Sequence, residues 1–193
     1  MMLKDKFGRD IHDLRISVTD RCNFSCVYCK SADPKNYFPH QELLNWDEFL
    51  RLSRILVGLG IRKVRVTGGE PLLRPGVVDF ISRLRQIDGL EDVAITTNGY
   101  LLPEMAGDLA AAGSPRVTVS LDSMDPAKFT RMTRTPRSLE KVMAGIDAAL
   151  EAGLKPVKVN IVLVEGSTTM KLWILPVSPE SVTLSSASSN SCP

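Results

Sequence analysis

Hydrophobic positions along the chain follow two periods in turn, which predicts a regular succession of strands and helices. Five short segments are rich in β-branched residues, as strands are; they span residues 14–19, 64–68, 93–97, 117–121 and 157–163. Four longer segments repeat apolar residues every three to four positions, as amphipathic helices do; they span residues 46–60, 76–87, 102–113 and 138–153.

This succession predicts an α/β fold with a parallel sheet, either doubly wound or closed toward a barrel. In both arrangements ligands bind at the carboxyl ends of the strands. Most of the predicted strands run directly into polar or glycine-bearing residues, in the sequences TDRCNFSC, TGGEP, TTNG and SLDS. We therefore expect a functional site at these strand ends.

The alternation stops at about Gly166. The following residues, 167–193, are rich in serine and proline and contain no amphipathic helix to continue the pattern. We expect a core over residues 1–166 and an aberrant or disordered tail over residues 167–193.

Composition narrows the class of protein. The chain has 193 residues, 44% of them hydrophobic and 24% charged, which suits one globular domain. The net charge is only +2 and the basic residues are scattered, so no concentrated basic face for nucleic acid is expected. The charged start is unlike a secretory signal, and no stretch approaches the roughly 20 apolar residues of a membrane span. We expect a soluble cytoplasmic protein.

Three of the four cysteines lie in one short segment, as Cys22, Cys26 and Cys29. Clustered thiols in a reducing compartment more often bind metal or do redox chemistry than form disulfides. Structural zinc usually takes four ligands, and His12 and His40 have no ligand-like spacing. Three cysteines fit an iron–sulfur cluster that keeps one iron open for another ligand. The alternative is three small buried apolar side chains.

With the intervening Tyr28, this CxxxCxxC segment resembles the signature of the radical S-adenosylmethionine (radical SAM) enzymes. The resemblance implies a [4Fe-4S] cluster whose open iron chelates S-adenosylmethionine and cleaves it to a 5′-deoxyadenosyl radical. It also implies a partial (β/α)6 TIM-like barrel with about five of six strands present. Tyr28 stands where these enzymes place a residue beside the adenine.

Two further features concern binding. Gly68 and Gly69 end a predicted strand, where they either permit close approach of a ligand or simply form a turn. Arg15, Arg65 and Lys158 lie on predicted strands among hydrophobic neighbours. Taken alone, each of these side chains could equally face solvent or pair with an acidic residue. If all three converge on one interior, they need an anionic partner there, and a triphosphate would provide it.

Together LRISVTDRCNFSCVYC, VRVTGGEPLLRP, ITTNGYLL, VSLDS and KPVKVNIVLV resemble the GTP 3′,8-cyclases of molybdenum-cofactor (molybdopterin) biosynthesis, from Asp13 to about Gly166. The resemblance implies that S-adenosylmethionine contacts Tyr28, Gly69 and Ser120. It implies that GTP contacts Arg15, Arg65, Thr96 and Lys158. An electron donor is implied as a partner, and a homodimer is a further expectation.

The resemblance stops after VLVEG, where these enzymes continue with a sequence like VNDDEIVDFA, a sixth strand and three cysteines for a second cluster. Read one base earlier, Met170-Lys171 must give Glu and Trp173-Ile174 must give Asp. We interpret residues 167–193 as an out-of-frame translation, and Cys192 is not expected to be a ligand. An incomplete barrel exposes a sheet edge, so we expect an unstable chain that holds a cluster without completing cyclisation.

Two alternatives stay open. One is another radical SAM enzyme, such as a peptide-modifying one, against which Arg15, Arg65 and the KVN segment argue. The other is a non-catalytic metal-binding module built on the three clustered cysteines. A nucleotide-binding assay distinguishes a GTP cyclase from the first alternative. Protein made without air should be brown if it holds an iron–sulfur cluster and colourless if it is the second alternative with zinc.

Overall fold

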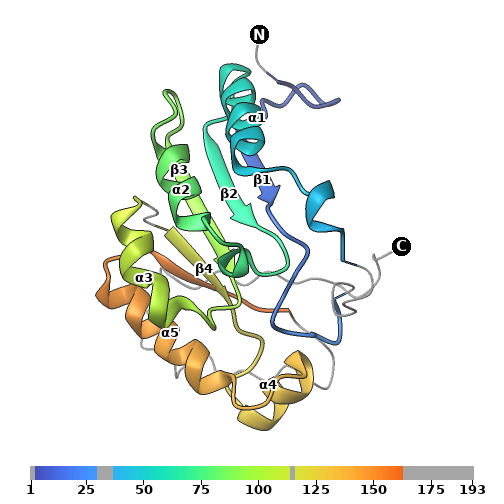
Figure 1. Cartoon of the computed structure of the whole chain (residues 1–193), viewed down its shortest axis with the longest axis vertical. Coiled ribbons are helices and arrows are strands. Elements are labelled where there is room, and N and C mark those ends of the chain that lie inside the picture. The colour runs from blue at the N-terminus through green and yellow to red at the C-terminus, as the bar shows by residue number, and fades with distance from the viewer. Residues whose placement is uncertain (1–2, 30–36, 114–115, 163–193) are drawn as a thin grey trace.

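Five parallel strands form one sheet in the computed structural model, which describes residues 3–29, 37–113 and 116–162. The strands lie side by side in chain order, β1-β2-β3-β4-β5 (Figure 1). Their bounds are β1 Asp13–Ser17, β2 Lys63–Thr67, β3 Asp92–Thr97, β4 Arg116–Ser120 and β5 Val157–Asn160. The α/β fold class and its parallel sheet are thus confirmed, as an open portion of a barrel.

Helices connect the strands, as parallel pairing requires. Their bounds are α1 Trp46–Gly58, α2 Val77–Arg85, α3 Leu102–Ala111, α4 Pro126–Thr133 and α5 Leu139–Glu151, with 3-10 turns at His40–Glu42 and Pro71–Leu73. Asn45 and Glu48 form a capping box that fixes the start of α1. The four predicted helices are confirmed, whereas α4 was not predicted. Its start is set by Asp125, whose side chain accepts hydrogen bonds from the amides of Ala127 and Lys128.

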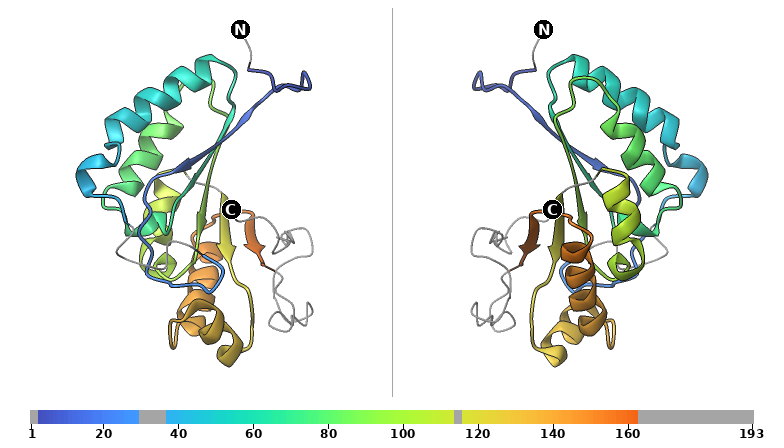
Figure 2. Two further views of the ribbon diagram at one scale, coloured as in Figure 1. Left: turned by 90° about the vertical axis from the view of Figure 1, so that its right-hand side faces the viewer. Right: turned by 90° about the vertical axis from the view of Figure 1, so that its left-hand side faces the viewer.

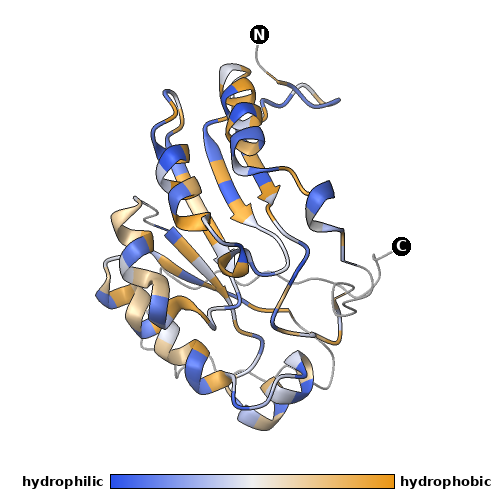
Figure 3. Cartoon of the chain, in the orientation of Figure 1, coloured by the Kyte–Doolittle hydropathy of each residue, from blue (hydrophilic) through white to orange (hydrophobic). Residues whose placement is uncertain are grey.

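The two faces of the sheet differ in polarity. Along β2, Val64 and Val66 are buried, while Lys63, Arg65 and Thr67 point to the opposite face. The helices cover only the apolar face, as the side views show (Figure 2). Hydrophobic and hydrophilic positions alternate visibly along the strands (Figure 3). Within the described residues, the opposite face of the sheet therefore carries polar side chains and no helix.

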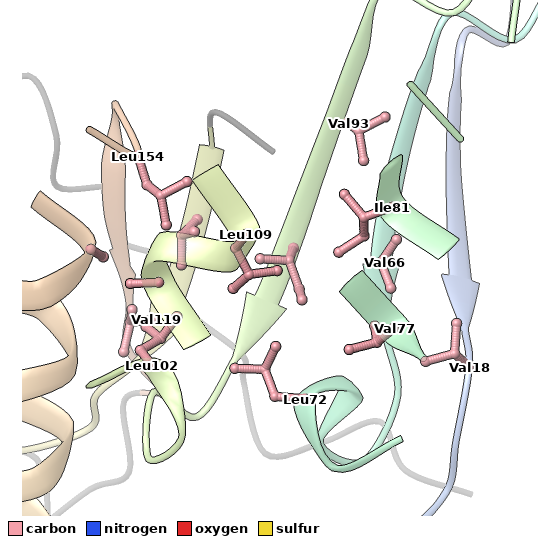
Figure 4. Packing of buried hydrophobic residues seen from close by; sticks show 14 of the residues in the cluster. Val18, Val66, Leu72, Val77, Ile81, Val93, Leu102, Leu109, Val119 and Leu154 are labelled. Atoms are coloured by element: carbon pink, nitrogen blue, oxygen red, sulfur yellow. The ribbon is translucent and has the colours of Figure 1, made fainter. Parts of the chain in front are cut away.

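The hydrophobic core fills the layer between helices and sheet. Ile81 and Val77 of α2 lie toward Val66 and Val93 of the sheet (Figure 4). Leu109 of α3 belongs to the same cluster and is fully buried. This packing holds the strands in register and fixes the positions of the loops that follow them.

Some expectations fall partly or wholly outside the described residues. The last strand was predicted to reach Leu163, whereas β5 ends at Asn160 and Leu163 is not described. The core boundary at residue 166, the tail 167–193 and Cys192 also lie outside the described residues. Among the residues that are described, no helix is both long and apolar enough to cross a membrane.

Close packing of α5 on α3 depends on Gly145. A Cβ atom there would lie 2.4 Å from the Gly99 carbonyl oxygen and 3.0 Å from the Leu102 Cβ. We expect Gly145→Ala to destabilise the fold by roughly 1–3 kcal/mol, despite the higher helix propensity of alanine. Gly107→Ala in α3, where a Cβ meets nothing within 4 Å, should instead stabilise it by about 0.5–1 kcal/mol. Urea unfolding of both variants measures the difference, and equal effects would contradict this packing.

Candidate functional site

The three clustered cysteines lie in the loop that follows β1, at the carboxyl end of the sheet. Cys22 and Cys26 are partly buried and Cys29 is exposed, and within the described residues none of the three forms a disulfide. Among the residues that the structure describes, no three His, Cys, Asp or Glu side chains lie close enough together to hold a single metal ion. The chemistry of the three cysteines fits an iron–sulfur cluster, because soft thiolate ligands favour such clusters.

The cysteine loop is anchored by its backbone. The amides of Ser25 and Val27 donate to the carbonyls of Thr133 and Met132, at 3.0 and 2.9 Å. Both carbonyls belong to the last turn of α4, where helix carbonyls lack partners within the helix. The unpredicted helix therefore holds the cysteine segment in place.

An aromatic side chain provides a second anchor. Phe24, between the first two cysteines, is 4% exposed. Its ring meets Tyr100 and Phe129 edge-on, with centroids 5.9 and 6.1 Å apart. Such contacts fix the loop against α4 and the segment after β3.

Burial shapes the charge state of the thiols in the chain. It raises the pKa of Cys26 to about 12, with the Asp122 carboxylate adding to the effect, and raises the pKa of Cys22 as well. Metal binding must therefore displace protons from both sulfurs, because thiolates are the ligands.

Tyr28, a predicted contact of S-adenosylmethionine, is tied to the loop after β4. Its hydroxyl donates to Oδ2 of Asp122 at 2.5 Å, and Oδ1 of Asp122 accepts from the Val162 amide at 2.9 Å. Burial raises the pKa of Asp122, while these bonds oppose the rise. Asp122 lies two residues beyond Ser120, which is another predicted contact of S-adenosylmethionine.

Gly69 lies against the backbone that leads from β1 into the cysteine loop. Its amide donates to the Thr19 carbonyl at 2.6 Å, and the Glu70 amide donates to the Arg21 carbonyl at 2.8 Å. A Cβ on Gly69 would lie 2.4 Å from the Arg21 oxygen. Close approach of the chain's own backbone thus accounts for the glycine, and its contact with S-adenosylmethionine stays a prediction.

Glu70 joins the loops after β2 and β3 and is fully buried. Its Oε1 accepts from the Leu72 amide at 3.0 Å and the Thr97 hydroxyl at 2.8 Å, and its Oε2 accepts from the Asn98 amide at 2.7 Å. Burial raises the pKa of Glu70, and the three hydrogen bonds oppose the rise. The carboxyl group fixes the position of Asn98, whose side chain reaches the cysteine loop.

We expect Glu70→Gln to destabilise the fold, because an amide nitrogen cannot accept the bonds that a carboxylate oxygen accepts. One buried N–H or O–H donor is then left without a partner, which costs about 1–3 kcal/mol. Chemical unfolding at constant pH measures the loss. Glu104→Gln, at an exposed residue of α3 paired with Lys141, is the matched control and should cost under about 1 kcal/mol. Equal losses in both variants would contradict the role of Glu70.

The four predicted GTP contacts converge on the polar face of the sheet. Arg15, Arg65, Thr96 and Lys158 line one hollow of about 440 Å³. Its remaining lining residues are Thr67, Thr118 and Asn160. Sequence alone placed the four on strands, and the structure brings them together.

Strand register arranges this face in rows. Arg15 pairs with Arg65, and the row continues through Ala94 to Arg116. The next row toward the carboxyl ends holds Thr96, Thr118 and Lys158. Beyond it, Ser120 pairs with Asn160. Arg15 and Arg65 therefore lie in the row of the hollow farthest from the carboxyl ends of the strands, and Lys158 lies one row nearer to those ends.

The cations on this face of the sheet differ in their pairing. Arg116 forms an ion pair with Asp92. Within residues 3–29, 37–113 and 116–162, no ion pair is formed by Arg15, Arg65 or Lys158. Arg65 donates instead to the hydroxyls of Thr96 and Thr118, at 3.3 and 3.0 Å. Burial lowers the pKa of Arg65, and the charges of Arg116 and Arg15 lower it further. This arrangement suits an anionic ligand.

Sequence reasoning missed three residues that organise the site: Glu70, Asn98 and Asp122. Each stands in a segment that the sequence singled out, in TGGEP, TTNG or SLDS. Their long-range partners are 27 to 94 positions away along the chain. The position of each polar residue within the loop that follows a strand was the signal that the sequence offered.

Comparison with known sequences adds independent information. The profile of the radical SAM superfamily matches residues 16–173. The GTP 3′,8-cyclase of Heliobacterium modesticaldum is 51% identical over 162 residues, which are 84% of this chain and 49% of that protein. The GTP 3′,8-cyclase of Thermodesulfovibrio yellowstonii is 52% identical over 165 residues, 85% of this chain and 51% of that protein. The chain spans about half the length of these relatives.

Solved structures share the fold at low identity. SuiB of Streptococcus suis bound to S-adenosylmethionine aligns with a TM-score of 0.68 and 20% identity, over 80% of this chain and 35% of that one. Methylornithine synthase aligns with a TM-score of 0.64 and 18% identity, over 81% of this chain and 46% of that one. These likenesses establish the fold of the sheet and its helices.

Proposed function

We propose that this chain, which belongs to the radical SAM superfamily, carries two sites of a GTP 3′,8-cyclase of molybdenum-cofactor biosynthesis. These are the cluster site and the nucleotide site. In this proposal Cys22, Cys26 and Cys29 hold one [4Fe-4S] cluster. Tyr28, Gly69 and Ser120 contact S-adenosylmethionine. The residues proposed to contact GTP are Arg15, Arg65, Thr96 and Lys158.

The observation that carries the proposal is the hollow that Arg15, Arg65, Thr96 and Lys158 share. The hollow lies on the polar face of the sheet, and the cysteine loop follows β1 at the carboxyl end of the same sheet. When bound, the cluster supplies the electron that cleaves S-adenosylmethionine, and the resulting radical abstracts a hydrogen from substrate. The chain must therefore hold cofactor and substrate next to each other and keep water away from them.

The rows of the hollow suggest how GTP is oriented. Arg15 and Arg65 attract the triphosphate to the row farthest from the strand ends, where guanidinium groups can bind it bidentately, and Lys158 adds a third cation one row nearer. The hydroxyls of Thr96 and Thr118 lie one row nearer the strand ends and suit the ribose. Ser120 and Asn160 lie one row further toward the carboxyl ends of the strands. In this orientation the ribose faces the cofactor.

Further partners and the location are also proposed. An electron donor must reduce the cluster, and a second copy of the chain is a proposed partner in a homodimer. We propose a cytoplasmic location, because a reducing compartment keeps the three cysteines of the loop out of disulfides.

A nucleotide-binding measurement tests the substrate. The iron-loaded chain, prepared without air, should bind GTP more tightly than guanosine, because the triphosphate provides the contacts with Arg15, Arg65 and Lys158. A peptide-modifying enzyme has no need for this preference. Equal affinity for GTP and guanosine would contradict the proposal.

A further inference from the structure

Two N–H groups point at the sulfur of Cys22. The backbone amide of Phe24 lies 3.4 Å from Sγ, and the side-chain nitrogen Nδ2 of Asn98 lies 3.8 Å from it. The first bond is local to the loop. The second comes from the segment after β3, 76 positions away in sequence.

The orientation of the Asn98 side chain is fixed by its other bonds. Its Oδ1 accepts from the Tyr100 amide at 3.0 Å, and its Nδ2 donates to Oδ1 of Asn23 at 2.7 Å. Exchanging oxygen and nitrogen would set an NH₂ group against the Tyr100 N–H. Of the two hydrogens on Nδ2, one serves Asn23, which leaves the other for the sulfur of Cys22.

The backbone of Asn98 is fixed as well. Its amide donates to the buried carboxylate of Glu70 at 2.7 Å, and the residue is only 9% exposed. Water therefore has little access to compete for the side-chain amide. A buried chain of hydrogen bonds runs from Glu70 through Asn98 to Cys22.

We propose that Asn98 is a positioning residue for Cys22 and that its side-chain N–H makes the cluster bound there easier to reduce. This inference rests on the proposed cluster site. Hydrogen bonds to a ligating sulfur stabilise the added negative charge of the reduced state and so tune the reduction potential. The two N–H donors described above point at the sulfur of Cys22, whereas the surroundings of the Cys26 sulfur include the Tyr28 hydroxyl and the Asp122 carboxylate.

The reduction potential of the assembled chain tests this role. Asn98→Leu removes the donor without adding charge. Asn98→Asp keeps the acceptor for Tyr100 but loses both donors. Both variants should shift the potential to more negative values, by about a tenfold change in the reduction equilibrium, or ~59 mV for one electron. A redox titration followed by electron paramagnetic resonance measures the shift.

Thr97→Val is the matched control, because Thr97 bonds to Glu70 at 2.8 Å from the neighbouring position. A merely structural role for this segment would move the potential in Thr97→Val as well. We expect Thr97→Val to lower stability and leave the potential unchanged. Unchanged potentials in Asn98→Leu and Asn98→Asp, or equal shifts in all three variants, would overturn the inference.

If the Asn98 variants lose their iron, a measurement on Asn98 itself, in the unsubstituted chain, still tests the inference. With ¹⁵N in the side-chain amide of asparagine, the reduced cluster should show a nitrogen coupling, and Asn23→Ala should retain it. Absence of this coupling in an iron-loaded chain overturns the inference alone. A chain that binds no iron at all overturns the cluster site and, with it, the inference.

Discussion

Replacing Cys26 with alanine should leave the chain unable to retain iron, whereas the unsubstituted chain assembled without air should hold about four iron atoms. A cluster with three protein ligands and one open iron has no spare ligand, so losing one thiolate leaves two irons without protein. Alanine is smaller than cysteine and its position is only partly buried, so the loop can fold around it. Iron and sulfide analysis and the brown absorption of the cluster measure the loss.

Cys192→Ser is the control for this experiment. Cys192 is the one cysteine outside the loop, and the sequence gives it no ligand-like spacing. We expect Cys192→Ser to retain iron at the level of the unsubstituted chain, while Cys22→Ala and Cys29→Ala match Cys26→Ala. Full iron content in Cys26→Ala would mean that the three-cysteine loop is not the cluster site.

Arg65→Gln should weaken GTP binding by about 10- to 100-fold, which corresponds to roughly 1.5–3 kcal/mol for a hydrogen bond to a charged group. The same substitution should leave the stability of the ligand-free chain unchanged or higher. Arg65 is half-buried beside two other arginines and forms no ion pair within the described residues, so removing its charge relieves repulsion. Calorimetric titration with GTP and chemical unfolding measure the two effects.

The opposite directions of these effects separate a binding role from a structural one. Arg83→Gln makes the same change in α2, within the layer of helices. There Arg83 forms an ion pair with Asp47 of α1. We expect Arg83→Gln to leave GTP affinity unchanged. A loss of stability in Arg65→Gln without a loss of affinity would assign Arg65 to the fold alone.

The sequence predicted the strands well because burial on one face imposes a period of two. Val64 and Val66 are buried beneath the helices, and Arg65 between them faces the hollow. The same period placed Arg15, Thr96 and Lys158, whose convergence the resemblance to GTP 3′,8-cyclases had implied. Their common hollow required the sheet register, which no local pattern contains.

The rest of the site depends on contacts that are distant in sequence. Asn98 belongs to an Asn-Gly pair, which by itself is typical of a turn. Its side chain matters only because Asn23 and Cys22 lie beside it in the folded chain. Glu70 likewise appears as one letter of TGGEP, and its burial follows from the meeting of two loops.

The helix α4 was missed for a related reason. It has eight residues, Pro126–Thr133, too few to show a clear helical period. Asp125 followed by proline is a helix-start signal that the sequence did contain. The role of α4 depends on a contact that is distant in sequence, because its last carbonyls accept hydrogen bonds from the cysteine loop.

The transfer of deuterium from substrate tests most directly whether one face of this chain holds both cofactor and GTP. The iron-loaded, reduced chain is incubated with S-adenosylmethionine and GTP deuterated at C3′ of the ribose, and 5′-deoxyadenosine is analysed by mass spectrometry. We expect deuterium in the 5′-deoxyadenosine, and none with the Arg65→Gln chain at limiting GTP. Unlabelled 5′-deoxyadenosine, formed at the same rate with and without GTP, would contradict a GTP site beside the cysteine loop.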